Sequence, residues 1–187
     1  MVGDTIFALA SGYGRAGVAI LRVSGPAAYQ GATRLAGREL PARRAVRAGL
    51  IEEGGDTLLD RALALFFPGP ASFTGEDVVE LHVHGGLAVI EGVLSALGRL
   101  EGFRLAEPGE FTRRSFENGK IDLTAAEGLA DLVEAETEAQ RNQALRQIDG
   151  ALAQFSESCR TRLMAALAHW EAAIDFSDEL LPKETEM

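Results

Sequence analysis

Three side chains with metal-binding or acid–base chemistry stand at alternate positions of one short segment. The pattern from Asp77 to His84 predicts a β-strand with Val78, Glu80, His82 and His84 on one face and only apolar valine and leucine side chains on the other from residue 79 onward. Two imidazoles beside a carboxylate can bind zinc or another divalent metal. The third histidine, His169, lies far away in a helical segment. The residues leave three interpretations open: a metal site, a polar pocket wall, or a solvated strand face.

Two glycine-rich strings resemble phosphate-binding loops only in part. Residues 12–17 spell Gly-x-Gly-x-x-Gly, but a dinucleotide-binding turn must open a helix, and the apolar run at 18–23 predicts a strand. A Walker loop needs Ser or Thr after its Gly-Lys pair, whereas Gly119-Lys120 is followed by Ile121. This sequence is therefore not expected to hydrolyse GTP or ATP by Walker machinery.

The strand that carries Glu80 belongs to a predicted α+β arrangement. Strands are predicted at 4–10, 18–23, 45–53, 58–67, 77–84 and 103–105, and helices at 27–36 and 87–100. The Gly-Gly-Asp turn at 54–56 predicts that the strands on either side of it form an antiparallel hairpin. Residues 68–75, PGPASFTG, are a loop by composition.

The last third of the sequence consists mostly of helix-forming residues. A short helix is predicted at 110–116, and the Asn-Gly pair at 118–119 ends it. Thr124 and Glu127 form a capping-box pattern, which predicts a helix from there to about Glu134.

One long amphipathic helix is predicted to follow, from Thr137 to Ile174. Thr137 and Gln140 form a second capping-box pattern, and apolar residues then recur every three or four positions. Only Gly150 interrupts this run of about 35 residues, a length typical of bundles or coiled coils. Because the sequence supplies little to cover the apolar seam, we expect an incomplete all-α domain, with Cys159 on that seam as a packing residue.

Charge and composition exclude several classes of protein. The 187 residues include 18 basic and 28 acidic side chains, a net charge of −10, which disfavours a general binder of nucleic acid or of anionic membranes. Residues 1–50 hold seven arginines against two acidic residues, so an anion is expected to bind there. The single cysteine, the lack of a signal-peptide pattern and the lack of a membrane-spanning stretch predict a cytoplasmic protein with no membrane partner.

Blocks of sequence spread over nearly the whole chain carry a more specific signal than any single motif. They are GRAG at 14–17, ILRVSG at 20–25, SFTGEDVVEL at 72–81, HGG at 84–86, PGEFT at 108–112, FENGKIDL at 116–123 and AAIDF at 172–176. In order and spacing these blocks closely resemble the MnmE (TrmE) family of tRNA-modification GTPases. Two departures are the absence of prolines before residue 14 and the bulky Val83, where that family commonly has glycine.

The resemblance implies an architecture. A tetrahydrofolate-binding, aminomethyltransferase-like α+β domain that dimerises would be followed by a helical domain into which a G domain is inserted. Residues 1–118 are then expected to form the folate-binding and dimerisation domain, and residues 119–187 the first part of the helical domain. GTP, magnesium and potassium are expected only for the G domain, which would lie outside this sequence together with the remaining helices.

The resemblance also implies a cofactor, partners and site residues. Positions of the family's folate site correspond to Arg22, Glu80 and Lys120, with no catalytic residue and no metal ligand assigned. The folate, as a 5-formyl or 5,10-methylene tetrahydrofolate, would supply the carbon added at C5 of the wobble uridine of tRNA, together with a flavin-dependent partner protein. A carboxylate can accept the N–H groups of a pterin, and cations can meet carbonyl and tail oxygens.

Two alternatives stay open beside this interpretation. The first is a structural fragment that dimerises without binding folate. The second is a metal-dependent hydrolase that uses Glu80, His82 and His84.

Overall fold

The structure is a computed structural model that describes residues 3–175, apart from residues 53 and 56. Its chain divides into two compact units, residues 1–121 and residues 122–187. The family resemblance suggests a boundary after residue 118. Each unit is described by itself below.

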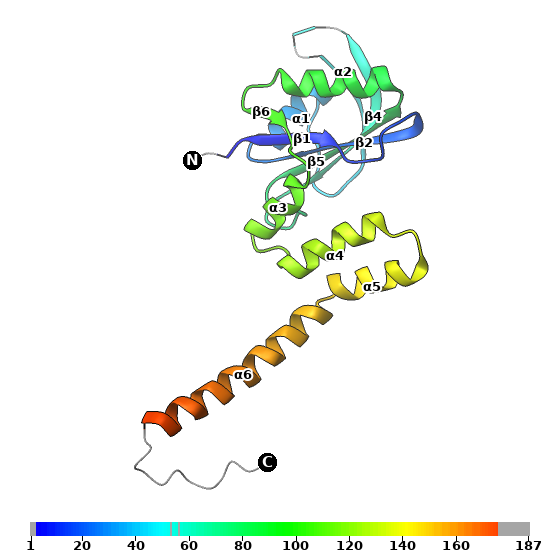
Figure 1. The fold of residues 1–187 in the computed structure, drawn as a ribbon. Coiled ribbons are helices and arrows are strands. Elements are labelled where there is room, and N and C mark those ends of the chain that lie inside the picture. The colour runs from blue at the N-terminus through cyan, green and yellow to red at the C-terminus, as the bar shows by residue number, and fades with distance from the viewer. Residues whose placement is uncertain (1–2, 53, 56, 176–187) are drawn as a thin grey trace. The chain divides into compact units, whose positions relative to one another are not determined.

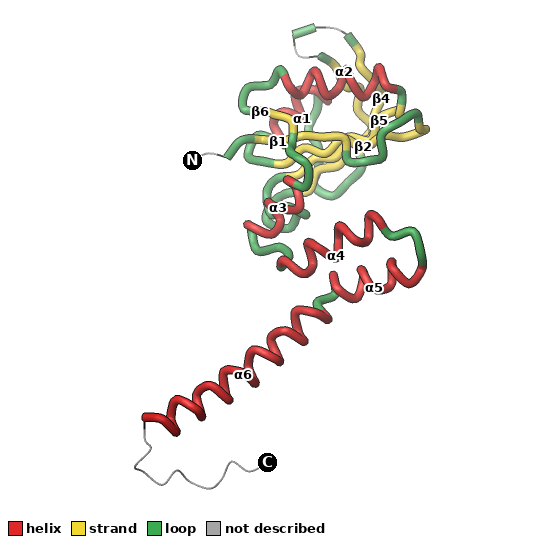
Figure 2. The backbone as a smooth tube through the Cα atoms, viewed as in Figure 1, coloured by secondary structure: helices red, strands yellow, loops and turns green. Residues whose placement is uncertain are grey.

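The first unit is built on a six-stranded sheet in the described part of the chain, with the order β3-β4-β5-β2-β1-β6 (Figures 1 and 2). Its strands are β1 (Thr5–Leu9), β2 (Ala16–Ser24), β3 (Val46–Ile51), β4 (Leu58–Phe67), β5 (Val78–Gly85) and β6 (Phe103–Leu105). Neighbouring strands are antiparallel except for β1 and β6, which are parallel. The predicted α+β class and the β3–β4 hairpin are confirmed.

Two helices cover one face of this sheet and close the hydrophobic core. Helix α1 (Ala28–Ala36) contributes Leu35, and α2 (Leu87–Gly98) contributes Leu97, which pack with Leu21 and Leu81 of the central strands. These four side chains are fully buried. Burial of one such leucine contributes about 1.5–3 kcal/mol, so this face holds the helices in place.

The other face of the central strands carries the polar residues. In the β2–β5 register Arg22 lies opposite Glu80, and Ile20 lies opposite His82. Because side chains alternate along a strand, Arg22 and Glu80 point away from the side that α1 and α2 cover. The predicted strand at 77–84 and its polar face are confirmed.

The Gly-x-Gly-x-x-Gly string does not open a helix. Residues 10–15 form a connection without regular structure, and β2 begins at Ala16. The geometry that a dinucleotide-binding turn needs is therefore not formed, as the sequence predicts.

A loop and a short helix lie beside the polar end of the central strands. The 68–77 loop connects β4 to β5, and helix α3 (Glu110–Glu117) follows β6. Gly75 has φ of 81°, a left-handed conformation, and a β-carbon there would lie 3.1 Å from Cβ of Asn118. The loop and the end of α3 therefore approach each other closely.

The second unit begins with a helical hairpin. Helix α4 (Leu123–Glu134) packs against α5 (Glu138–Ile148), and Gly128 sits where the two helices touch. A β-carbon at Gly128 would lie 3.1 Å from Cβ of Gln147 and 3.2 Å from the carbonyl oxygen of Ala144. Glycine at this position permits the close approach.

The helix starts are partly as predicted. Thr137 and Gln140 form the expected capping box of α5. The expected box of Thr124 and Glu127 is wrong, because the Asp122 carboxylate caps α4 by accepting from the backbone N–H of Ala125. Asp122 takes this position because carboxylates are among the strongest N-caps, and it also accepts the hydroxyl hydrogen bond of Thr124.

The predicted continuous helix from Thr137 to Ile174 is also wrong. Helix α5 ends at Ile148, and a separate helix, α6 (Ala151–Asp175), follows. Gly150 has φ of 87° and donates its N–H to the carbonyl of Gln147, an arrangement that ends a helix. Gly150, predicted from the sequence to lie inside a continuous helix, instead lies just after the end of α5.

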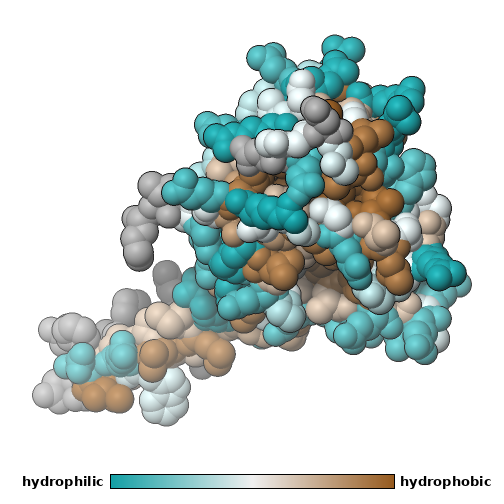
Figure 3. Space-filling view, turned by 90° about the horizontal axis from the view of Figure 1, so that it is seen from above, coloured by the Kyte–Doolittle hydropathy of each residue, from teal (hydrophilic) through white to brown (hydrophobic). Residues whose placement is uncertain are grey.

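Helix α6 leaves its apolar seam uncovered, as expected from the sequence. In the described part of α6 no residue is buried, and Phe155 and Trp170 are 66% and 71% exposed. Figure 3 shows hydrophobic surface, in brown, on this helix. Over residues 3–175, leaving aside 53 and 56, no helix is both long and apolar enough to cross a membrane.

Candidate functional site

An ion pair on the open sheet face brings two of the three expected site residues together. Arg22 donates from Nε and Nη2 to one oxygen of Glu80, Oε1, at 3.0 and 2.8 Å. The two side chains are 29% and 18% exposed, so the pair is shielded but can be reached from solvent. Arg22 and Glu80 are 58 residues apart in the sequence, and the pairing of β2 with β5 brings them together.

Two aromatic rings lie near the Arg22 guanidinium. Its central carbon lies 5.5 Å from the ring centre of Phe73, in the 68–77 loop, and 5.8 Å from that of Phe111, on α3. Both distances are within the range of cation–π attraction. The rings restrict the directions in which the guanidinium can point.

The pair keeps hydrogen-bonding capacity for a ligand. Both hydrogen bonds from Arg22 to Glu80 go to Oε1, so Oε2 takes no hydrogen bond from Arg22. Nε2 of His82 is 3.5 Å from that oxygen and has no hydrogen-bond partner in the described structure. The arrangement therefore offers a carboxylate oxygen as an acceptor beside a guanidinium.

Lys120 contacts the 68–77 loop, which also carries Phe73, but it does not contact the Arg22–Glu80 ion pair in the described structure. Its ammonium donates to the carbonyl of Pro70 at 2.9 Å. Pro70 and Phe73 belong to the same 68–77 loop, so this loop connects Lys120 to the surroundings of Arg22. No contact between Lys120 and either member of the pair is seen in the described structure.

The two histidines of the strand face have different surroundings. Nδ1 of His84 is 2.7 Å from Oδ1 of Asp60, whose other oxygen accepts the backbone N–H of His84 at 2.7 Å. Burial acts to raise the pKa of Asp60, but the hydrogen bonds from His84 outweigh it and lower that pKa. His82 instead faces Glu80. Within the described residues no group of three or more acidic, histidine or cysteine side chains could hold a metal ion, so the metal-hydrolase interpretation gains no support.

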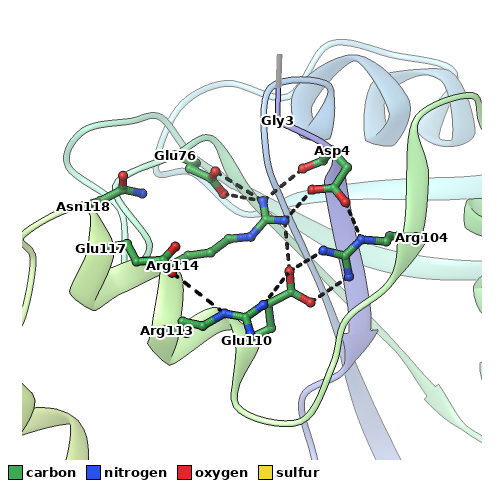
Figure 4. A pocket seen from close by; sticks show the side chains of 9 residues that line it. All are labelled: Gly3, Asp4, Glu76, Arg104, Glu110, Arg113, Arg114, Glu117 and Asn118. Atoms are coloured by element: carbon green, nitrogen blue, oxygen red, sulfur yellow. Dashed lines mark hydrogen bonds and ion pairs between the residues drawn. The ribbon is translucent and has the colours of Figure 1, made fainter. Parts of the chain in front are cut away.

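A second cluster of charges surrounds Arg114 of α3, beside a hollow of about 370 Å³ (Figure 4). The Arg114 guanidinium donates to a carboxylate oxygen of Asp4 at 2.7 Å and to both oxygens of Glu76 at 3.2 Å. It also donates to Oε1 of Glu110 at 3.1 Å. The cluster thus ties the start of β1, the 68–77 loop and α3 to one buried cation.

Glu110 is the most deeply buried acid of this cluster, with a side chain that is 1% exposed. Arg104 donates two hydrogen bonds to it, and with Arg114 and the backbone N–H of Glu107 this overcomes burial and lowers its pKa to about 2. The charge density of residues 107–117 is visible in the sequence. The partners Asp4 and Glu76 are not, because they are brought in from distant segments.

Comparison with known proteins identifies the family. Residues 5–120 match the family described as GTP-binding protein TrmE N-terminus, and residues 123–187 match the MnmE helical domain. The chain belongs to the MnmE family. The two matches fall on either side of the junction at residues 121 and 122, where the structure divides.

Relatives of high identity agree with this assignment. The chain is 61% identical over 180 residues to the tRNA modification GTPase MnmE of Parvibaculum lavamentivorans. The matched region covers 96% of this chain and 41% of that protein. It is 58% identical over 179 residues to the human mitochondrial 5-taurinomethyluridine-[tRNA] synthase subunit GTPB3, covering 95% of this chain and 36% of that protein. The chain therefore spans about two fifths of the length of these MnmE relatives.

Proposed function

We propose that this chain is the tetrahydrofolate-binding, dimerising part of a tRNA-modification enzyme, with its site at Arg22, Glu80 and Lys120. The observation that carries the proposal is the shielded Arg22–Glu80 pair, which keeps Oε2 of Glu80 as an acceptor. Support for the tRNA context comes from the MnmE family and the names of its relatives.

The chemistry of a reduced folate suits these side chains. A pterin edge presents neighbouring N–H donors and a carbonyl oxygen, which complement a carboxylate oxygen beside a guanidinium. Glu80 would accept the N–H groups, while Arg22 and Lys120 would meet carbonyl or tail oxygens. For Lys120 this requires that its ammonium leave the Pro70 carbonyl or share its three donors with the ligand. When bound, the folate would supply the one-carbon unit.

The open sheet face supports the proposal that two copies associate through the first unit. Leu63 lies opposite His82, and Leu65 lies opposite Glu80, so apolar side chains flank the polar row. Leu63 and Val18 remain about half exposed in the single chain. Exposed apolar residues around a polar site are typical of interaction surfaces.

Within a complete enzyme the bound folate would serve modification of the wobble uridine of tRNA in the cytoplasm. A flavin-dependent protein would be the partner in that reaction. The naming of the human relative as a synthase subunit is consistent with a second component.

Titration calorimetry with 5-formyltetrahydrofolate tests the site. Replacing Glu80 with Gln keeps the size of the side chain and removes its charge, so we expect binding to weaken about 10- to 100-fold, because a charge-assisted hydrogen bond contributes about 1.5–3 kcal/mol. Lys120→Ala should weaken binding as well. Glu91→Gln, an exposed acid on α2, is the matched control and should bind like the unmodified chain.

Two results would contradict the proposal. Unchanged affinity in both Glu80→Gln and Lys120→Ala would remove these residues from the site. Absence of saturable binding by the unmodified chain would favour a purely structural role in dimerisation.

A further inference from the structure

Helix α3 holds the backbone of the 68–77 loop at two successive residues. The Ser115 hydroxyl donates to the carbonyl of Phe73 at 2.7 Å, and the Asn118 side-chain amide donates to the carbonyl of Thr74 at 2.7 Å. Ser115 and Thr74 are fully buried. Neutral hydrogen bonds of this kind contribute about 0.5–1.5 kcal/mol each, and buried partners are costly to leave unpaired.

The same loop is also fixed to strand β2, close to Arg22. The hydroxyls of Thr74 and Ser24 are joined by a 2.7 Å hydrogen bond, and Ser24 donates to Oε2 of Glu76 at 2.8 Å. Ser24 lies two residues after Arg22 and on the same face of β2. Arg114 of α3 donates to both carboxylate oxygens of Glu76 at 3.2 Å.

These anchors determine where the Phe73 ring lies. The Phe73 carbonyl is bound by α3, and the next residue is bound both by α3 and by β2, so the backbone at Phe73 has little freedom. The Phe73 ring is thereby placed within cation–π distance of the Arg22 guanidinium, as is the ring of Phe111 on α3 itself. Helix α3 therefore acts on Arg22 in two ways, directly through Phe111 and indirectly through the loop.

We propose that Ser115 and Asn118 are positioning residues of the folate site. They hold Phe73 on Arg22, so that both Arg22 donors stay on Oε1 of Glu80 and Oε2 stays available to the ligand. Neither residue contacts the ligand in this arrangement. The inference rests on the proposed folate function and adds to it the residues that keep its site in shape.

The test combines affinity with a local spectroscopic signal. Because Trp170 is the single tryptophan of the chain, a Trp170→Phe, Phe73→Trp variant carries one reporter on Arg22. Ser115→Ala and Asn118→Ala are introduced both into the natural chain, for titration with 5-formyltetrahydrofolate, and into the reporter chain, for tryptophan emission. Glu117→Ala is the matched control, since this exposed α3 residue pairs with Arg113 of the same helix.

We expect each of Ser115→Ala and Asn118→Ala to weaken folate binding about five- to tenfold and to shift the emission of the reporter tryptophan to longer wavelength. Asn118→Gln, which keeps the amide donor on an exposed side chain, should recover part of both effects. Glu117→Ala should change neither. Together these results would support a positioning role, since general destabilisation would not be recovered by restoring the donor.

Four outcomes would overturn the inference. Unchanged affinity with shifted emission would mean that the position of Phe73 does not matter for binding. Weakened affinity with unshifted emission would mean that Ser115 or Asn118 contacts the ligand. If Glu80→Gln weakens binding while Ser115→Ala and Asn118→Ala match the control, the positioning role fails and the folate site stands. Unchanged affinity in both Glu80→Gln and Lys120→Ala would instead reject the site itself, and the positioning role with it.

Discussion

Glu110 illustrates how single residues of this chain depend on their partners. Its carboxylate is almost completely buried, and such a charge is stable only when paired and hydrogen-bonded. Arg104 and Arg114 supply these partners, from β6 and from one turn further along α3. The low pKa of about 2 is the consequence, since the ionised form is the one that the site binds.

This predicts an acid-sensitive contribution to stability. The pKa of Glu110 falls from an ordinary 4.5 to about 2, so its stabilisation is fully present above pH 4.5 and is lost as the pH falls towards 2. Because its partner Arg104 is 40% exposed, solvent screening limits the effect to about 1–3 kcal/mol. Denaturant unfolding at pH 6 and pH 3 should show a smaller pH dependence for Glu110→Gln than for the unmodified chain. An identical pH dependence in both, with Glu117→Gln as the exposed control, would contradict this prediction.

At the scale of elements, close approach between α4 and α5 depends on one glycine. A β-carbon at Gly128 would lie only 3.1 Å from side-chain carbons of Gln147 and Ile148, so a larger side chain requires these neighbours to shift. The hairpin is completed by the capping box of α5 and by the hydrogen bond from the Gln147 amide to the Thr124 carbonyl. The two helices therefore pack by backbone proximity as well as by apolar contact.

Replacing Gly128 with Leu should open this hairpin. Because overpacking typically costs about 1–3 kcal/mol, we expect a lower free energy of unfolding for the second unit and a loss of helical circular dichroism. Ala130→Leu, on an exposed position of α4, is the control and should leave both quantities unchanged. Equal stability of the two leucine variants would show that α4 and α5 do not pack as described.

At the scale of the whole molecule, the hydrophobic core lies in one of the two units. The main core cluster extends from Phe7 of β1 to Leu100 after α2, and its members all precede residue 122. The Arg22–Glu80 pair, the 68–77 loop, α3 and Lys120 lie in this unit as well. The proposed folate site therefore does not depend on the described helices of the second unit for its internal contacts.

A fragment of residues 1–121 is accordingly expected to fold by itself. Its thermal midpoint should lie within a few degrees of the first-unit transition of the full chain, because the fragment keeps the whole described core cluster from Phe7 to Leu100. Circular dichroism melting of the fragment beside the full chain measures this. A fragment that lacks a cooperative transition would show that residues 122–187 contribute to the stability of the first unit.

The sequence predicted the elements better than their connections. The alternation at 77–84 placed Glu80 on a polar strand face, and the glycine turn at 54–56 placed the β3–β4 hairpin. The end of α5 at Gly150 was missed, because a glycine within an apolar repeat is compatible with both a continuous helix and a C-cap. Periodicity cannot distinguish the two, since the choice depends on backbone φ at that residue.

For the candidate site, the sequence by itself determined which side chains are available and on which face of a strand or helix each one lies, because these follow from local periodicity and chemistry. Only the tertiary structure decided their partners. It joined Arg22 to Glu80 across the β2–β5 register, bound Lys120 to the Pro70 carbonyl and brought Asp4 to Arg114. Such contacts depend on how the sheet orders its strands and where the loops return, which no local pattern encodes.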